Sequence, residues 1–232
     1  VIVLDSYLTS ETNHIYSQHP GIKVVGLSSP ISPSEARYQL ASRSETTYTL
    51  FLDDDLVLTE TSVPVLYQRL VQHPHISVVS AAWREKKGFR ELAQLFHLAE
   101  IERQKVIFKS FLYRKECERL SLSAVRVDGL HASMMVRTSI FEEVNFDPRF
   151  GFYLELFDFF MQCKRNGLVC EALTDTYFWH RPSEYRLSTK RATVPRTQGI
   201  LLFQSKWGLT PVGSLGYTPT SASLKQILSN LY

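Results

Sequence analysis

The sequence predicts one α/β domain over residues 1–232, with a central, mostly parallel sheet flanked by helices. Short apolar runs alternate with helix-type segments in the first 58 residues, and strand–helix–strand units of this size favour parallel strands covered by helices. Hydrophobic residues make up 44% of the chain and charged residues 21%, which is typical of a folded globular protein. The length suits one large domain, and no clear boundary divides it.

The first third of the chain contains three predicted strands and two predicted helices. The strands are VIVLD (1–5), IKVVGL (22–27) and YTLFLD (48–53). Between the last two, residues 32–45 begin with Ser-Pro-Ser-Glu, which is a helix N-terminus signal. Residues 59–74 form the second helix, with Thr59 or Thr61 as its cap and Pro64 in its first turn.

The rest of the chain continues the alternation. We expect a strand at 76–83, a long helical stretch at 90–119, and strands at 123–129 and 132–137. A short helix at 138–144, capped by Thr138, precedes a helix at 152–167 that Gly167 ends in the left-handed conformation. Two short strands, LVCEAL and TYFWH, follow, and the tail is predicted as loop with one helix near 222–232.

Charge and cysteine content limit the classes of partner and compartment. The three cysteines show no paired-ligand spacing, so free thiols in a reducing, cytoplasmic setting are expected. Lys and Arg outnumber acids ten to six over residues 84–119 and six to one over 181–206. The first stretch is a solvated face or a peripheral contact with anionic membrane lipids, and the second suits an anionic ligand. Neither interleaves aromatic and basic residues as nucleic-acid-binding modules do, so nucleic acid is not an expected partner.

The most informative motif is the aspartate triplet Asp53-Asp54-Asp55, which ends the predicted strand TLFL. Ligands of open α/β sheets lie at the carboxyl ends of the strands. Asp53 and Asp55 point to one side and Asp54 to the other, because side chains alternate along an extended chain. Two converging carboxylates suit Mg²⁺ or Mn²⁺, which prefer oxygen ligands. The alternative, an acidic turn or helix start, would require no strand before it.

Two enzyme families use this local pattern. LFLDDDLV fits the Asp-x-Asp-x-Val signature of haloacid dehalogenase-like phosphatases, but those enzymes place it on their first strand and need a second aspartate pair. The other match extends over about 200 residues. Its segments are VIVLDS, SEARYQLA, LFLDDD, the run from VRVDG to MQCKRNG (125–167) and GILLFQSKWG (199–208). In order and spacing, these segments resemble the family 2 glycosyltransferases of the GT-A fold, a Rossmann-like fold that binds nucleotide-diphosphate sugars. The pattern is most similar to the β-1,4-N-acetylgalactosaminyltransferase branch.

The resemblance implies a donor site, a metal site and an acceptor site. Asp5 would contact the nucleotide base, Arg37 the base or diphosphate, and Asp53 the ribose, with Asp54 the least defined member of the triplet. Asp55 would hold Mn²⁺ or Mg²⁺, and His180, after TYFW, matches an additional histidine ligand. Arg181 and Lys206 are expected on the donor side. The basic residues Arg181, Arg186, Lys190, Arg191 and Arg196 form either a lid over the donor or a polar tail.

The acceptor side and the catalytic base leave alternatives open. Asp128 and His131 either line the site for a glycan or glycolipid acceptor or have structural roles. An inverting transferase needs a carboxylate base. The usual base position holds Leu156, so Glu155 is favoured, with Asp158 as the alternative on the same helix face. Both residues could also be ordinary exposed helix carboxylates.

The expected activity is transfer of a hexosyl or N-acetylhexosaminyl group from a UDP-linked donor. Residues 1–58 would form the nucleotide-binding half, 59–208 the acceptor side with the catalytic helix, and 209–232 a tail. Family members begin with a strand and helix before the one that VIVLD resembles, so either that first unit is missing here or the nucleotide pocket is built differently. Tyr38 also stands where Asn is usual. A phosphatase, a nucleotidyl-transferring enzyme and an inactive nucleotide- or glycan-binding relative are the alternatives.

Overall fold

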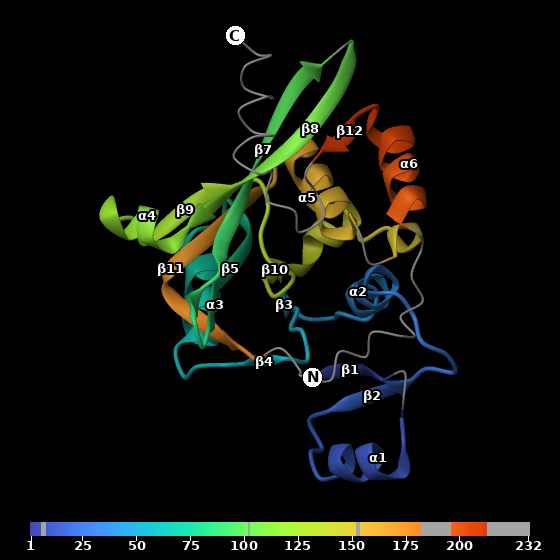
Figure 1. Ribbon diagram of the computed structural model, residues 1–232. Coiled ribbons are helices and arrows are strands. Elements are labelled where there is room, and N and C mark those ends of the chain that lie inside the picture. Colours follow the sequence, from blue (N-terminus) through green and yellow to red (C-terminus); the bar gives the residue numbers. More distant parts are fainter. Residues whose placement is uncertain (6–7, 102, 152–153, 182–195, 213–232) are drawn as a thin grey trace.

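A computed structural model describes residues 1–5, 8–101, 103–151, 154–181 and 196–212. Figure 1 shows the elements in chain order, and their bounds follow. The first half contains β1 (Ile2–Asp5), α1 (Ser10–Ser17), β2 (Lys23–Gly26), α2 (Pro33–Ala41), β3 (Tyr48–Leu50), β4 (Leu56–Val57), α3 (Ser62–Gln72), β5 (Ile76–Glu85), β6 (Gly88–Phe89), β7 (Glu91–Ile101) and β8 (Gln104–Tyr113). The second half contains α4 (Arg114–Arg119), β9 (Ala124–Val127), β10 (Met135–Arg137), the 3-10 turns η1 (Thr138–Glu142) and η2 (Pro148–Phe150), α5 (Glu155–Arg165), β11 (Val169–His180), α6 (Arg196–Trp207) and β12 (Thr210–Val212).

The central sheet has the strand order β3-β10-β5-β11-β4, with β6 beside β5 and β9 beside β11. Strands β3, β5 and β11 run in one direction, but β10 lies antiparallel between β3 and β5. The α/β fold is confirmed. The prediction that the sheet is mostly parallel is wrong for the pairing of neighbouring strands, because only β5 and β11 pair in parallel within the central sheet.

Strands β1 and β2 form a separate parallel pair, joined through α1. In Figure 1 this small unit lies at the bottom, below α2 and β3, and it contains the chain's first predicted nucleotide-binding residue, Asp5. A third sheet, β12-β8-β7, extends from the opposite side of the molecule.

Helices cover the two faces of the central sheet. Leu66 and Leu70 of α3 are fully buried in one core, together with Phe178 of β11. On the other face, Phe157 and Phe160 of α5 are buried in the larger core. Burying one apolar face of each helix against the sheet is the main stabilising contribution of such layers.

The predicted helix at 90–119 is wrong over most of its length, because Glu91–Ile101 and Gln104–Tyr113 pair as the antiparallel strands β7 and β8. Mixed charge and helix-favouring Leu, Ala, Glu and Gln suggested a helix, but tertiary packing overrides such weak propensities. Glu100 lies opposite Lys105 across the hairpin, and the rings of His97 and Phe108 stack with centroids 5.0 Å apart. Only the end of the stretch, α4, is helical.

Other elements differ in extent. The two strands predicted after Gly167 form one strand, β11, with a register shift between Leu173 and Tyr177. The helix predicted at 138–144 is the 3-10 turn η1, and α6 and β12 occupy part of the predicted loop. The predicted helix near 222–232 lies outside the described residues. Among the described residues, no helix is long and apolar enough to cross a membrane.

Candidate functional site

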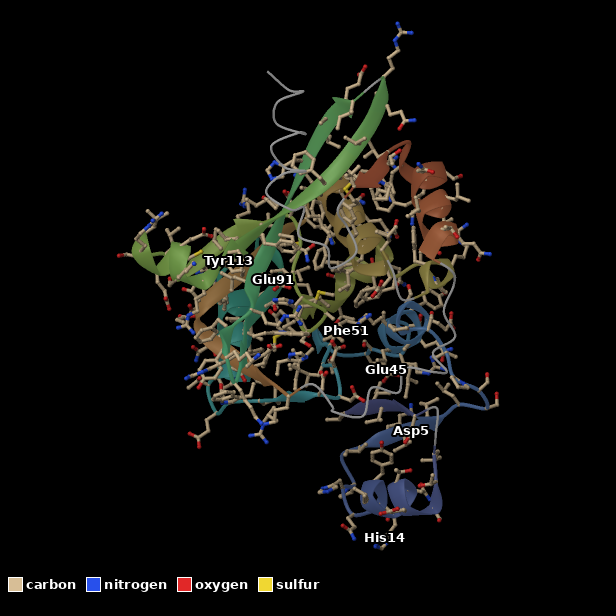
Figure 2. The ribbon with its side chains drawn as sticks, in the orientation of Figure 1. Asp5, His14, Glu45, Phe51, Glu91 and Tyr113 are labelled. Atoms are coloured by element: carbon tan, nitrogen blue, oxygen red, sulfur yellow. The ribbon has the colours of Figure 1, made fainter. Side chains whose placement is uncertain are left out.

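The carboxyl ends of β1 and β3 carry the predicted donor residues. Asp5 is the last residue of β1 and accepts a hydrogen bond from the Tyr16 hydroxyl at 3.1 Å. The aspartate triplet follows β3, and the backbone N–H of Asp53 donates to the Ser133 hydroxyl at 3.3 Å. Figure 2 labels Asp5 and Phe51, which lies just before the triplet. The hydrogen bond to Ser133 holds the start of the triplet beside the segment that leads into β10.

Arg37 connects the triplet to the predicted base. Ser32 caps α2 by accepting from the backbone N–H of Glu35, and this helix carries Arg37 toward the end of β3. The Arg37 guanidinium donates to Asp53 at 3.1 Å and lies 3.4 Å from a Glu155 oxygen. The side chains of Arg37 and Glu155 are 12% and 9% exposed, whereas that of Asp53 is 32% exposed, so water is largely excluded from the contact with Glu155 only. One cation thus brings together two predicted site residues that are far apart in the sequence.

Glu155 opens α5, directly after Leu154, whose backbone has a φ of 67°. This left-handed turn, uncommon for a leucine, directs the chain into the helix. Glu155 is 7% exposed, and burial raises the pKa of its carboxyl to about 7, against the lowering effects of Arg37, a backbone hydrogen bond and Lys109. A carboxyl with a pKa near 7 suits proton transfer at neutral pH. Leu156, at the usual base position, packs against the core instead.

Asp158, the alternative base, is fully buried and held by three side chains. The Trp207 indole, the Lys206 ammonium and the Gln162 amide each donate to its carboxylate at 2.8 Å. Burial raises its pKa despite these partners. The contacts with Lys206 and Trp207 connect α6 to α5, and they give Asp158 a structural role. Lys206 also pairs with Asp147 at 3.2 Å, and its role in donor binding stays a prediction.

The third aspartate of the triplet faces a histidine. The Nε2 atom of His180 lies 3.2 Å from an Asp55 oxygen, and its Nδ1 atom lies 2.6 Å from a Glu85 oxygen. A carboxylate oxygen and an imidazole nitrogen form a donor set suited to Mn²⁺ or Mg²⁺ when phosphates and water complete the coordination. Within the described ranges, no group of three or more such side chains could hold an ion by itself. Asp55 and His180 therefore fit an ion that is also held by a substrate.

The two predicted acceptor residues have partners that explain their positions. His131 is buried, stacks on Trp83 with ring centroids 4.4 Å apart, and bonds the Glu91 carbonyl through Nε2. Burial lowers the pKa of His131. Asp128 accepts from the backbone N–H of Phe96 and pairs with Lys164. Their acceptor roles stay predictions.

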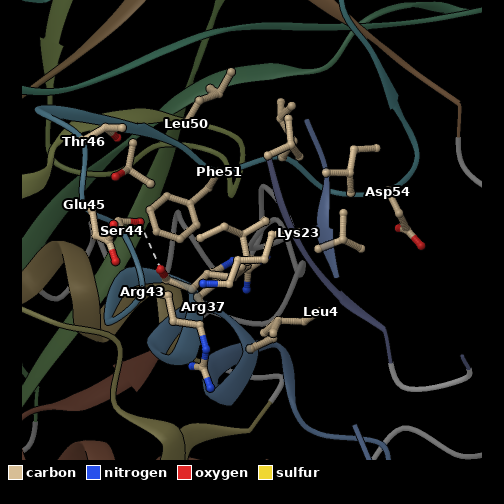
Figure 3. Close-up of a pocket in the computed structure, with 18 of the residues that line it drawn as sticks. Leu4, Lys23, Arg37, Arg43, Ser44, Glu45, Thr46, Leu50, Phe51 and Asp54 are labelled. Atoms are coloured by element: carbon tan, nitrogen blue, oxygen red, sulfur yellow. Dashed lines mark hydrogen bonds between the residues drawn. The ribbon is translucent and has the colours of Figure 1, made fainter. Parts of the chain in front are cut away.

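A cavity of about 850 Å³ lies between the β1–β2 unit and the α2–β3 segment. Figure 3 shows Leu4, Lys23 and Phe51 around it, with Arg37 and Asp54 also among its lining residues. Arg37, Asp53 and Asp54 are among its lining residues, so three of the predicted donor residues border this cavity.

The side chain of Arg181 is exposed, and its backbone N–H donates to the Asp55 carbonyl at 2.8 Å. The remaining residues of the predicted basic lid, including the side chain of Arg196, lie outside the described part of the chain.

Sequence reasoning missed Glu85 and Lys109. Glu85 was missed because the strand was expected to end at Trp83, although the turn-forming KKG that follows Glu85 would have allowed two more residues. Lys109 was missed because its segment was assigned to a helix. Burial lowers the pKa of Lys109 to about 8, and its ammonium lies 5.0 Å from the centre of the Phe157 ring. The run VIFKSFLY is rich in β-branched and aromatic residues, which is a signal for a strand.

Comparison with known proteins gives a family match. The profile of glycosyl transferase family 2 matches residues 1–144, which include the aspartate triplet. No curated protein matches the sequence.

Solved structures share the fold at low sequence identity. A structure of GalNAc-T7 with UDP, GalNAc and Mn²⁺ superposes with a TM-score of 0.58 at 11% identity, covering 82% of this chain and 40% of that one. A mycobacterial protein gives 0.53 at 19% identity, covering 90% and 64%. S. aureus TarS gives 0.54 at 16% identity, covering 78% and 50%. The chain thus spans between two fifths and two thirds of the length of these structures, and it has the GT-A fold.

Proposed function

The chain belongs to glycosyl transferase family 2, and we propose from this premise that it is a metal-dependent inverting glycosyltransferase. Its donor is a UDP-linked hexose or N-acetylhexosamine, and its acceptor is the hydroxyl of a glycan or glycolipid. The observation that carries the proposal is the Arg37 bridge, which joins Asp53 at 3.1 Å to Glu155 at 3.4 Å. A donor-side residue and a candidate base are thereby held beside one another.

On the donor side, Asp5 contacts the base of the nucleotide and Asp53 the ribose. Arg37 and Arg181 lie near the diphosphate and complement its charge. Asp55 and His180 would hold Mn²⁺ or Mg²⁺, which would supply positive charge for the departing nucleoside diphosphate. The GalNAc-T7 structure, which contains UDP, GalNAc and Mn²⁺, supports this choice of donor and metal.

On the acceptor side, Glu155 is the general base. Its carboxylate takes the proton of the attacking hydroxyl while that oxygen forms a bond to the anomeric carbon. The bond between that carbon and the phosphate oxygen breaks on the opposite face, so the configuration inverts. The raised pKa of Glu155 makes it a stronger base than an exposed glutamate at the same pH.

Calorimetric titration tests the donor assignment. UDP, GDP and an orthophosphate analogue are titrated into the protein with and without Mn²⁺. We expect UDP to bind only when Mn²⁺ is present, and Asp55→Asn to weaken that binding by at least tenfold, while Glu143→Ala, an exposed control, binds as the native chain does. Binding of the phosphate analogue alone would favour the phosphatase alternative. Absence of any nucleotide binding would contradict the proposal.

A further inference from the structure

We propose that Glu85 is a positioning residue that fixes the tautomer and orientation of His180. It accepts the Nδ1 proton of the imidazole, which leaves the Nε2 lone pair directed to the side where Asp55 lies. The consequence for metal binding rests on the proposed function, but the tautomer itself does not.

The backbone places the three side chains together. Strand β11 runs between β5 and β4, and Trp179 pairs with Arg84 on one side and with Val57 on the other. The next residue, His180, lies opposite Leu56 of β4, beside Glu85 at the end of β5. A further backbone hydrogen bond, from Arg181 to the Asp55 carbonyl, fixes the start of the β4 strand against β11. Sheet pairing, rather than loop flexibility, therefore sets this contact.

The two contacts of the ring are unequal. The separation of 2.6 Å between Nδ1 and Glu85 is that of a strong, charge-assisted hydrogen bond, whereas Nε2 and Asp55 are 3.2 Å apart. In a neutral imidazole only one nitrogen carries a proton, and the closer acceptor determines which one it is. Both neighbours are carboxylates and can only accept, so a neutral ring donates its single proton to the nearer one through Nδ1, and Nε2 keeps its lone pair for a cation shared with Asp55.

Neighbouring groups hold both members of the pair. The Trp83 ring lies against the His180 ring with centroids 4.6 Å apart, and the His180 side chain is only 9% exposed. The Arg90 guanidinium lies 3.9 Å from the same Glu85 oxygen and above Trp83. The ring has little room to flip, and the charge of Glu85 has a cationic neighbour that stabilises it. A carboxylate in this place also raises the basicity of the opposite nitrogen as a metal ligand.

Mn²⁺ binding to the whole chain, followed by electron paramagnetic resonance without any nucleotide or acceptor, measures the effect on the site. We expect Glu85→Ala to weaken Mn²⁺ binding about 10- to 100-fold, the range for partners of metal-bound histidines. Glu85→Gln keeps an oxygen acceptor for Nδ1 and is expected to retain affinity within about threefold of native. Glu143→Ala serves as the surface control. Native affinity in Glu85→Ala, alongside a loss in His180→Ala, would overturn the proposal.

The imidazole nitrogen shifts of His180, measured by NMR on the metal-free chain in alkaline buffer, test the tautomer directly. We expect a proton on Nδ1 in the native chain and in Glu85→Gln, and a shift toward the Nε2–H tautomer in Glu85→Ala. A native ring protonated on Nε2 alone would overturn the proposal, even if Glu85→Ala failed to fold. If the native chain bound no Mn²⁺, the metal dependence under "Proposed function" would fail, while this measurement would still decide the role of Glu85.

Discussion

Glu155 and Asp158 lie one turn apart on α5, and the structure gives them opposite environments. Asp158 is fully buried and accepts from Trp207, Lys206 and Gln162, each at 2.8 Å. Glu155 is almost as buried, but its ion pair is a single, longer contact of 3.4 Å with the Arg37 guanidinium. Burial alone therefore does not define a catalytic carboxylate. A buried carboxylate that already accepts several hydrogen bonds holds the structure together, whereas one with few donors around it remains available to a substrate.

The largest expected effect is on turnover. Glu155→Gln removes the proposed base without changing its shape, so sugar transfer should fall about 10²- to 10⁴-fold. UDP binding in the presence of Mn²⁺ should stay within about twofold of native, because the donor residues are intact. UDP release from the donor sugar and calorimetry measure the two quantities. Near-native turnover would show that Glu155 is not the base.

The next effect is on stability. Asp158→Ala removes the carboxylate to which Lys206 and Trp207 donate. Because breaking a buried ion pair is costly, this change should lower the free energy of unfolding by about 3 kcal/mol. Urea denaturation gives this value, and Glu142→Ala, an exposed change, is the control. A loss below about 1 kcal/mol would mean that the α5–α6 contact does not depend on Asp158.

A pH-dependent effect separates the two carboxylates further. Burial raises the pKa of Glu155 from 4.5 to about 7, so the folded state binds more protons than the unfolded state in that interval. The stability of the native chain should therefore carry a contribution from Glu155 that falls as pH rises from about 4.5 to 7.

Glu155→Gln lacks this contribution, so it should gain about 3 kcal/mol relative to native between pH 4.5 and pH 8. Urea denaturation at several pH values checks this gain. A difference that does not vary with pH would mean that the pKa of Glu155 is the same in the folded and unfolded states.

The smallest effect concerns Arg37, the cation beside Glu155. Turnover should rise with pH and reach half its maximum near pH 7, because only the ionised Glu155 accepts a proton. Arg37→Met removes a charge that lowers the pKa of Glu155, so this midpoint should move about one unit higher. A pH–rate profile measures the shift, and Arg126→Met, on the exposed side of β9, should leave the midpoint in place. An unchanged midpoint in Arg37→Met would show that Arg37 does not act on the base.

Features that depend on local signals could be predicted from the sequence. The alternation of strands and helices predicted the α/β class, and the motif order predicted the family and the GT-A fold, both of which are confirmed. Ser32 caps α2, and Gly167 has a φ of 69° after α5, as predicted, because capping and left-handed turns involve only near neighbours. The position of the triplet at the end of β3 was local in the same sense.

The contacts between polar side chains could be seen only in the tertiary structure. Arg37 and its contact Glu155 are 118 positions apart in the sequence, and Trp207 and its contact Asp158 are 49 positions apart. No local sequence pattern therefore distinguished the two carboxylates. The β7–β8 hairpin and the Glu85–His180 contact likewise depend on packing and on pairing with other strands. The physical reason is the same in each case. Burial and hydrogen-bond partners, which set the charge and reactivity of a side chain, come from segments that are distant in the chain.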